Sequence, residues 1–166
     1  GVGEILLVDQ SPASRTPRSN PAVFTGAWEG IRKLFAATEA AQQGGMTASS
    51  FSFNAGNGRC PQCQGLGHER VEMQFMADIF VPCAVCEGKQ FTEEVLAIRW
   101  DRYSVTDVLR MTVTEAIEVF KNERAVVRKL QGLAEVGLGY LPLGQPLNTL
   151  SGGESQRLKL IRYLGS

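Results

Sequence analysis

The spacing of hydrophobic residues changes along this chain: strand-like patterns occur in the first hundred residues, beside one helical pattern, and only helical patterns follow. In the first half, a continuous apolar run at residues 5–8 predicts a buried strand, and the alternation over residues 71–81 predicts a half-buried strand or hairpin. The short apolar run at residues 95–98 predicts another strand. Helical spacing predicts helices over residues 28–37, 113–120 and 126–134. The pattern therefore predicts an α+β fold that becomes mainly helical after residue 100.

Three helix starts in the second half carry the spacing of a capping box. In this motif a Ser or Thr precedes an acidic residue by three positions, and the two side chains satisfy backbone N–H groups of the first turn. The three pairs are Ser104 with Asp107, Thr112 with Glu115, and Ser151 with Glu154. They predict helices that begin shortly after residues 104, 112 and 151.

Four cysteines form two Cys-x-x-Cys pairs, Cys60 with Cys63 and Cys83 with Cys86. Each pair can close a tight turn that directs two sulfurs at one ion, so the four thiolates predict a closed tetrahedral Zn²⁺ site. Two redox dithiols or plain buried cysteines are the alternatives. His68 follows the first pair and offers a further possible ligand, although four thiolates already complete the coordination shell.

The last predicted helix opens on a segment suited to binding phosphate. Leu150 is followed by Ser151, Gly152, Gly153 and Glu154. Free backbone N–H groups, two residues without side chains, a hydroxyl and the positive end of the helix dipole together form a cradle for an anion. An ordinary capped helix would explain the serine and the glutamate but leaves the paired glycines unexplained.

Length and charge limit the classes of protein that the chain can belong to. Its 166 residues suit one domain with a small insertion, and its formal net charge of zero excludes binding through bulk charge. The basic residues concentrate toward both ends, where Arg15 and Arg18 are candidates for contacts with DNA phosphates. A solvated charged surface is the alternative for each side chain. No apolar run is long enough to cross a bilayer, so we expect a cytoplasmic protein without a membrane partner.

These motifs, taken in order, resemble the UvrA family, the damage-recognising ATPase subunit of the bacterial excinuclease. The signature motif of ABC-type ATPases resembles Leu150 to Glu154, and the match lies in the C-terminal nucleotide-binding half of the family. The other segments that carry the resemblance are Asp9–Pro12, Arg15–Pro21, Phe51–Asn54, Gly58–Cys60, the glycine-rich turn after Cys63, Val81–Cys83, Gly137–Tyr140 and Leu143–Gln145.

The resemblance implies several roles that spacing alone does not give. Gln10 matches the Q-loop glutamine that senses Mg²⁺ and the γ-phosphate of ATP. Ser151, Gly152 and Gly153, flanked by Leu150 and Glu154, match the residues that complete an ATP site on the opposite nucleotide-binding domain. The four cysteines match the ligands of a zinc module that helps the homodimer engage damaged double-stranded DNA. A UvrB-like protein is the further partner implied in nucleotide excision repair.

The sequence also departs from a complete ATPase of this kind. It contains neither a P-loop nor an apolar strand ending in an Asp-Glu pair after the signature helix. We therefore expect no ATP hydrolysis by this chain alone and interpret it as an internal fragment of the second nucleotide-binding half. The predicted regions are 1–50 for the Q-loop strand, arginine loop and helix, 51–100 for the zinc module, and 101–166 for the helical signature subdomain.

Three other interpretations stay open at this point. The UvrA family includes paralogues linked to drug tolerance, so family membership alone does not establish a repair role. The glycine-rich turn after Cys63 also resembles the zinc region of DnaJ-type chaperones, which bind peptides, but that family repeats the turn four times and lacks the signature motif. A separate zinc DNA-binding domain would have to bind duplex without ATP.

Overall fold

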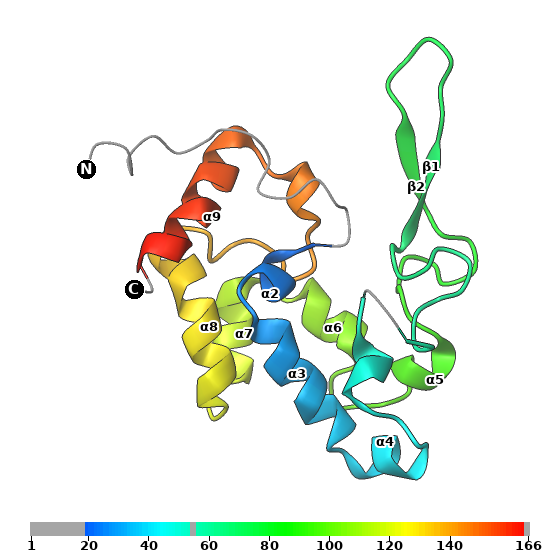
Figure 1. The fold of residues 1–166 in the computed structure, drawn as a ribbon, viewed down its shortest axis with the longest axis vertical. Helices are drawn as coiled ribbons and strands as arrows, with labels where there is room; N and C mark the ends of the chain where they lie inside the picture. The colour runs from blue at the N-terminus through cyan, green and yellow to red at the C-terminus, as the bar shows by residue number, and fades with distance from the viewer. Residues whose placement is uncertain (1–18, 54–55, 165–166) are drawn as a thin grey trace. The chain divides into compact units, whose positions relative to one another are not determined.

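The computed structural model describes residues 19–53 and 56–164. The predicted strand at residues 5–8 and the candidate residues Gln10, Arg15 and Arg18 lie outside the described residues. The described part combines helices with one two-stranded sheet, which agrees with the predicted α+β class (Figure 1). It divides into two compact units, residues 31–107 and residues 19–30 with 108–164. The predicted regions 1–50, 51–100 and 101–166 remain a prediction.

The two division points fall inside helices. Residues 30 and 31 both belong to α3 (Ala27–Ala36), and residues 107 and 108 both belong to α6 (Val105–Arg110). The prediction of a helix over 28–37 is confirmed by α3 within one residue at each end.

The helical unit contains α2 (Pro21–Phe24), α7 (Val113–Val119), α8 (Arg124–Glu135), a 3₁₀ turn η2 (Leu147–Thr149) and α9 (Gly152–Leu164). Helix α8 packs against both α7 and α9. Their apolar positions recur at helical spacing, so each helix turns one apolar face inward. Full burial of each large side chain stabilises the unit by roughly 1.5–3 kcal/mol. These fully buried side chains include Phe120, Leu130, Leu133, Leu138, Leu141, Leu143, Leu147 and Leu158.

The segment of turns between α8 and η2 positions the start of α9. The N–H of Val113 donates to Leu141 O at 2.9 Å, and the N–H of Thr114 donates to Gly139 O at 3.0 Å. A Cβ at Gly139 would lie 2.5 Å from Thr114 Oγ1, so this close approach requires glycine. Leu143 N–H donates to Met111 O at 2.8 Å. These bonds hold the segment along the start of α7, and η2 and α9 follow directly in the chain.

The second unit contains α4 (Glu39–Gln43), the 3₁₀ turn η1 (Ala48–Phe51), strands β1 (His68–Val71) and β2 (Ile79–Pro82), and α5 (Glu93–Leu96). The strands pair antiparallel with His68 opposite Pro82 and Val71 opposite Ile79. The core of this unit is aromatic, with ring centroids 5.6 Å apart both in the pair Phe35–Phe51 and in the pair Phe53–Phe91. Figure 1 shows the hairpin projecting from the part of its own unit that holds α5.

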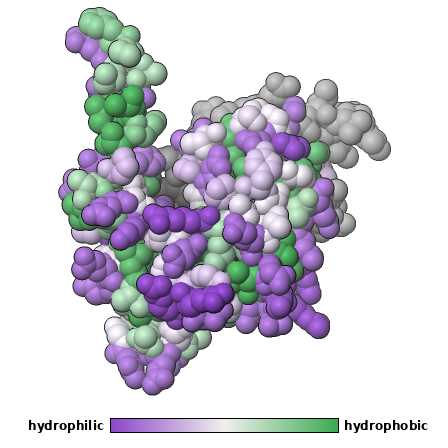
Figure 2. Space-filling model, turned by 180° about the vertical axis from the view of Figure 1, so that it is seen from behind, coloured by the Kyte–Doolittle hydropathy of each residue, from purple (hydrophilic) through white to green (hydrophobic). Residues whose placement is uncertain are grey.

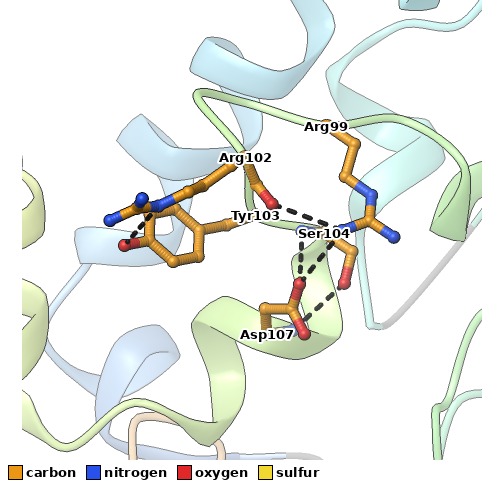
Figure 3. Close-up of polar contacts among 5 residues, drawn as sticks. All are labelled: Arg99, Arg102, Tyr103, Ser104 and Asp107. Carbon is orange, nitrogen blue, oxygen red and sulfur yellow. Dashed lines mark hydrogen bonds and ion pairs between the residues drawn. The ribbon is translucent and has the colours of Figure 1, made fainter.

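All three predicted capping boxes are confirmed. At the start of α6, Asp107 N–H donates to Ser104 Oγ at 3.2 Å, and Ser104 N–H donates to Asp107 Oδ2 at 3.0 Å (Figure 3). Arg99 adds an ion pair to the same carboxylate at 3.6 Å. At the start of α7, the N–H of Thr112 donates to Glu115 and holds the pKa of that carboxyl below its usual value. The third box lies at the start of α9.

The prediction of a strand at residues 95–98 is wrong. The segment Glu93–Leu96 is a helix, α5, because Thr92 caps it by accepting the N–H of Val95 at 3.4 Å and two glutamates occupy its first turn. Val95 and Ile98, three residues apart, are both buried. A short apolar run fits a strand or a helical turn equally well, so the cap decides between them.

The hairpin predicted over residues 71–81 is confirmed, but its predicted half-burial is wrong. Every residue of β2 is exposed. At the tip, Phe75 is 91% exposed and Met76 is 71% exposed. Figure 2 shows hydrophobic colour over much of this projecting arm. The alternating pattern therefore marks an arm with exposed apolar side chains rather than one face of a core.

No helix within residues 19–53 and 56–164 is long and apolar enough to cross a membrane.

Candidate functional site

The four cysteines of the second unit converge on one point. Their sulfurs all lie within 4.8 Å of one another, and all four side chains are buried. The Sγ atoms of Cys63 and Cys86 are 3.6 Å apart and those of Cys60 and Cys83 are 4.0 Å apart, far beyond the length of a disulfide bond. Sulfurs around a tetrahedral Zn²⁺ stand about 3.8 Å apart, given Zn–S bonds of about 2.3 Å. The cluster could therefore hold a metal ion, and the donor set fits zinc.

Two similar turns place the sulfurs. After Cys63 the chain reaches a positive φ at Gly67, whose N–H donates to Cys63 Sγ at 3.2 Å. After Cys86 it reaches a positive φ at Gln90, whose N–H donates to Cys86 Sγ at 3.4 Å. The φ values of Gly67 and Gln90 are 80° and 78°, so the second turn keeps the same backbone although it lacks the last glycine. Such N–H groups stabilise bound thiolates.

The side chain of Gln90 connects the two turns. Its Nε2 donates to Gly65 O at 3.1 Å, across the cluster from its own turn. The Gln90 side chain also lies against Gly67 of the first turn, where a Cβ would stand 2.8 Å from Gln90 Cγ. Glycine is therefore needed at position 67, because the Gln90 side chain from the second turn occupies the space that a side chain there would take. The sequence alone did not indicate this role for Gln90, because the contact joins residues 25 positions apart.

The chain enters and leaves the cluster side by side. Cys60 N–H donates to Gln90 O at 2.9 Å, and Thr92 N–H donates to Gly58 O at 2.9 Å. At the other side of the cluster, Cys83 N–H donates to Gly67 O at 3.0 Å, at the base of the β1–β2 hairpin. The cysteine cluster therefore fastens both the base of the hairpin and the two segments that connect it to α5 and η1.

Burial makes two of these thiols weaker acids than an ordinary cysteine. It raises the pKa of the Cys63 thiol to about 12 and also raises that of Cys86, whereas backbone N–H groups lower the pKa of Cys83. A metal ion must therefore displace thiol protons when it binds, so affinity falls as the pH falls.

His68 does not join the cluster. Its imidazole packs edge-on against Phe80 with ring centroids 5.0 Å apart. Among the residues that the structure describes, the one group of side chains placed to hold a metal ion consists of the four cysteines, without His68. The alternative of a histidine ligand is not supported, and His68 packs within the hairpin.

The segment from Leu150 to Glu154, predicted to bind phosphate, leads into α9 and forms its first turn in the helical unit. Glu154 N–H donates to Ser151 Oγ at 3.1 Å, and Ser151 N–H donates to Glu154 Oε1 at 3.0 Å. Leu150 caps the preceding turn η2 in an extended conformation, so the chain changes direction immediately before the helix. The capping box explains the serine and the glutamate as local structure.

Packing does not explain the two glycines of this segment. A Cβ added at Gly152 or at Gly153 would meet nothing within 4 Å, and both residues are exposed. Glycine in a helix costs about 0.5–1 kcal/mol relative to alanine. Two glycines at a helix start without a steric reason are typical of a backbone that a ligand approaches closely.

Tyr140 links the signature helix to the segment that precedes it. Its hydroxyl donates to Glu154 Oε2, which raises the pKa of Tyr140 and, with the N–H of Ser151, lowers that of Glu154. Glu154 is thus held ionised as part of the cap. The motif Gly137–Tyr140 includes this residue but does not predict its contact, which spans 14 residues and depends on the fold.

Comparison with known proteins identifies the family. The chain is 52% identical to "UvrABC system protein A" of Methanothermobacter thermautotrophicus, in an alignment that covers 98% of the chain. It is also 52% identical to the protein of the same name from Listeria monocytogenes, over 97% of the chain. The crystal structure of UvrA2 from Deinococcus radiodurans superposes on 95% of the chain with a TM-score of 0.91 and 49% identity. The chain belongs to the UvrA family. No family model matches it.

The match covers nearly all of this chain but only a small part of each UvrA relative. The chain spans 17% of the length of the curated UvrA relatives and 19% of the UvrA2 chain. It is therefore similar to one segment of UvrA, and the match includes both the cysteine cluster and α9.

Proposed function

We propose that this chain is the signature and zinc segment of a UvrA-type ATPase of nucleotide excision repair. The observation that carries the proposal is the presence, in one UvrA-family chain, of a buried four-cysteine cluster and of a capped helix start with two sterically unneeded glycines. The cysteine cluster suits structural Zn²⁺, and the capped helix start suits a phosphate.

In this proposal the start of α9 completes an ATP site whose other parts lie on the opposite nucleotide-binding domain. Ser151 would donate its hydroxyl, and Gly152 and Gly153 their N–H groups, toward the γ-phosphate, with Leu150 and Glu154 holding the turn. Mg²⁺ bound with ATP would neutralise charge at the phosphates. Gln10 is proposed as the Q-loop residue of the same segment. Because the P-loop lysine and the acidic pair are not in the sequence, the isolated chain is proposed not to hydrolyse ATP.

The zinc module is proposed to support contact with damaged double-stranded DNA. Zn²⁺ held by Cys60, Cys63, Cys83 and Cys86 would fix the base of the hairpin, whose exposed tip carries Phe75 and Met76. Arg15 and Arg18 are proposed as contacts to DNA phosphates. A homodimer and a UvrB-like protein are the proposed partners of the complete protein.

Native mass spectrometry of the full chain tests the metal half of this proposal. We expect one Zn²⁺ per chain, with a mass higher than that of the metal-free chain by one zinc less two protons, because the two charges of Zn²⁺ replace two protons at a given charge state. A folded chain purified without chelator that carries no metal would contradict the four-thiolate site. The redox alternative predicts instead a mass lower by two hydrogen atoms for each disulfide formed, and no bound zinc.

A further inference from the structure

A solvent-open cleft lies between α2, α8 and α9 of the helical unit. Its volume is about 490 Å³, and its lining includes Phe24 at the end of α2 and Ile161 near the end of α9. Arg162 lies ten residues after Gly152, the first residue of α9, which is about 15 Å along a helix at 1.5 Å per residue. The cleft is therefore separate from the signature segment at the other end of α9.

Three cations line this cleft, and no carboxylate of the described residues pairs with them. Arg128 and Lys129 come from α8 and Arg162 comes from α9. Within the described ranges, none of the three forms an ion pair. Glu135 also lines the cleft, so the lining keeps an excess of positive charge. Like charges that line one cleft repel one another, and an anion bound in the cleft offsets this repulsion.

The surrounding residues hold the cations in place. The Arg162 guanidinium lies over the Phe24 ring, 5.0 Å from its centroid, which is a cation–π geometry. The aliphatic end of Lys129 passes Gly26, where a Cβ would stand 3.8 Å from its Cδ and Cε atoms. Both side chains thus rest on the turn after α2 while their charged ends remain available to solvent and ligand.

We propose that this cleft binds backbone phosphates of duplex DNA. The inference rests on the proposed function, which brings DNA to this segment, and it adds a contact surface on the helical unit. The cationic row continues beyond the cleft, because Arg124 lies one turn before Arg128 on α8 and is likewise exposed. A row of cations suits a polymer of phosphates, whereas a single nucleotide would use only one end of it. Such contacts position a protein on DNA and read no sequence.

Salt-dependent binding of the full chain to a fluorescent duplex tests the proposal. The logarithm of the binding constant falls linearly with the logarithm of salt concentration, with a slope of about −0.9 for each phosphate neutralised. Each of the variants Arg128→Gln, Lys129→Gln and Arg162→Gln should make the slope shallower by about 0.9 and weaken binding roughly fivefold to tenfold near 0.1 M salt. The triple variant should lose close to the sum of these slopes.

A charge-matched control removes the same number of cations elsewhere. Arg102, Arg110 and Lys121 are exposed and lie outside the cleft lining. Their triple change to Gln should leave most of the slope intact. Equal losses in the two triple variants, or no duplex binding by the unmodified chain, would overturn the proposal. Displacement of the duplex by ATP at an equal concentration of phosphate groups would also overturn it and indicate a nucleotide pocket. Zinc content and the signature motif are untouched by these variants, so failure here leaves the proposed function standing.

Discussion

Removal of the metal is expected to release the segment from Gly58 to Thr92 while α8 stays protected from hydrogen exchange. A two-stranded hairpin is at best marginally stable by itself in water. This hairpin has no compensating core, because β2 is exposed along its whole length. What holds its base is the buried cysteine cluster and the backbone bonds around it. Structural zinc sites of this kind contribute on the order of 10 kcal/mol in small domains.

Hydrogen exchange with mass spectrometry measures this release. After chelation at neutral pH, or in the Cys83→Ser variant, amides from residue 58 to residue 92 should exchange at close to the rate of an unfolded peptide. Acidification should have the same effect, because protons compete with the metal for the thiolates. The control Met76→Ser introduces the same residue at the exposed tip and should leave protection unchanged. Unchanged protection after complete metal removal would show that the cluster does not hold this segment.

The second large effect is expected at the signature helix. We consider an exchange protein in which this chain replaces the matching segment of the Listeria monocytogenes relative, which is 52% identical over 97% of the chain. In this protein Gly153→Asp should reduce ATP hydrolysis to background, because a carboxylate at the helix start repels the γ-phosphate. The same carboxylate interacts favourably with the helix dipole, so the variant should be no less stable than the parent.

The matched control is Gly153→Ala. Its Cβ meets nothing within 4 Å, and alanine should stabilise the helix by about 0.5–1 kcal/mol. Any loss of ATP hydrolysis should be much smaller than with aspartate. Thermal unfolding measured beside the ATPase rate separates the two properties. Full ATPase activity in Gly153→Asp would exclude a role for this helix start at the phosphate.

Features set by near neighbours in the sequence were predictable. The three capping boxes depend on residues three positions apart, and the structure confirms each of them. The cysteine pairs predicted a shared site because each turn is local and the intervening residues suffice for a hairpin. The family resemblance also emerged from short motifs and is confirmed by the comparisons.

Features set by distant contacts were not predictable. The strand predicted at residues 95–98 failed for a local reason instead: a short apolar run does not by itself distinguish a strand from a helical turn, and the Thr92 cap three residues before Val95 decides for the helix. The alternation in the hairpin suggested half-burial, because periodicity shows which side chains share a face and not what covers that face. Gln90 and Tyr140 act through partners far along the chain, so no spacing marks them.

Survival of ultraviolet irradiation by cells that carry only the exchange protein tests the proposed repair function most directly. The proposal predicts survival close to that of cells with the intact Listeria monocytogenes relative, and loss of that survival with either Cys83→Ser or Gly153→Asp. An exchange protein that is soluble, binds zinc and hydrolyses ATP, yet leaves the cells as sensitive as cells without it, would contradict the proposal that this chain serves excision repair.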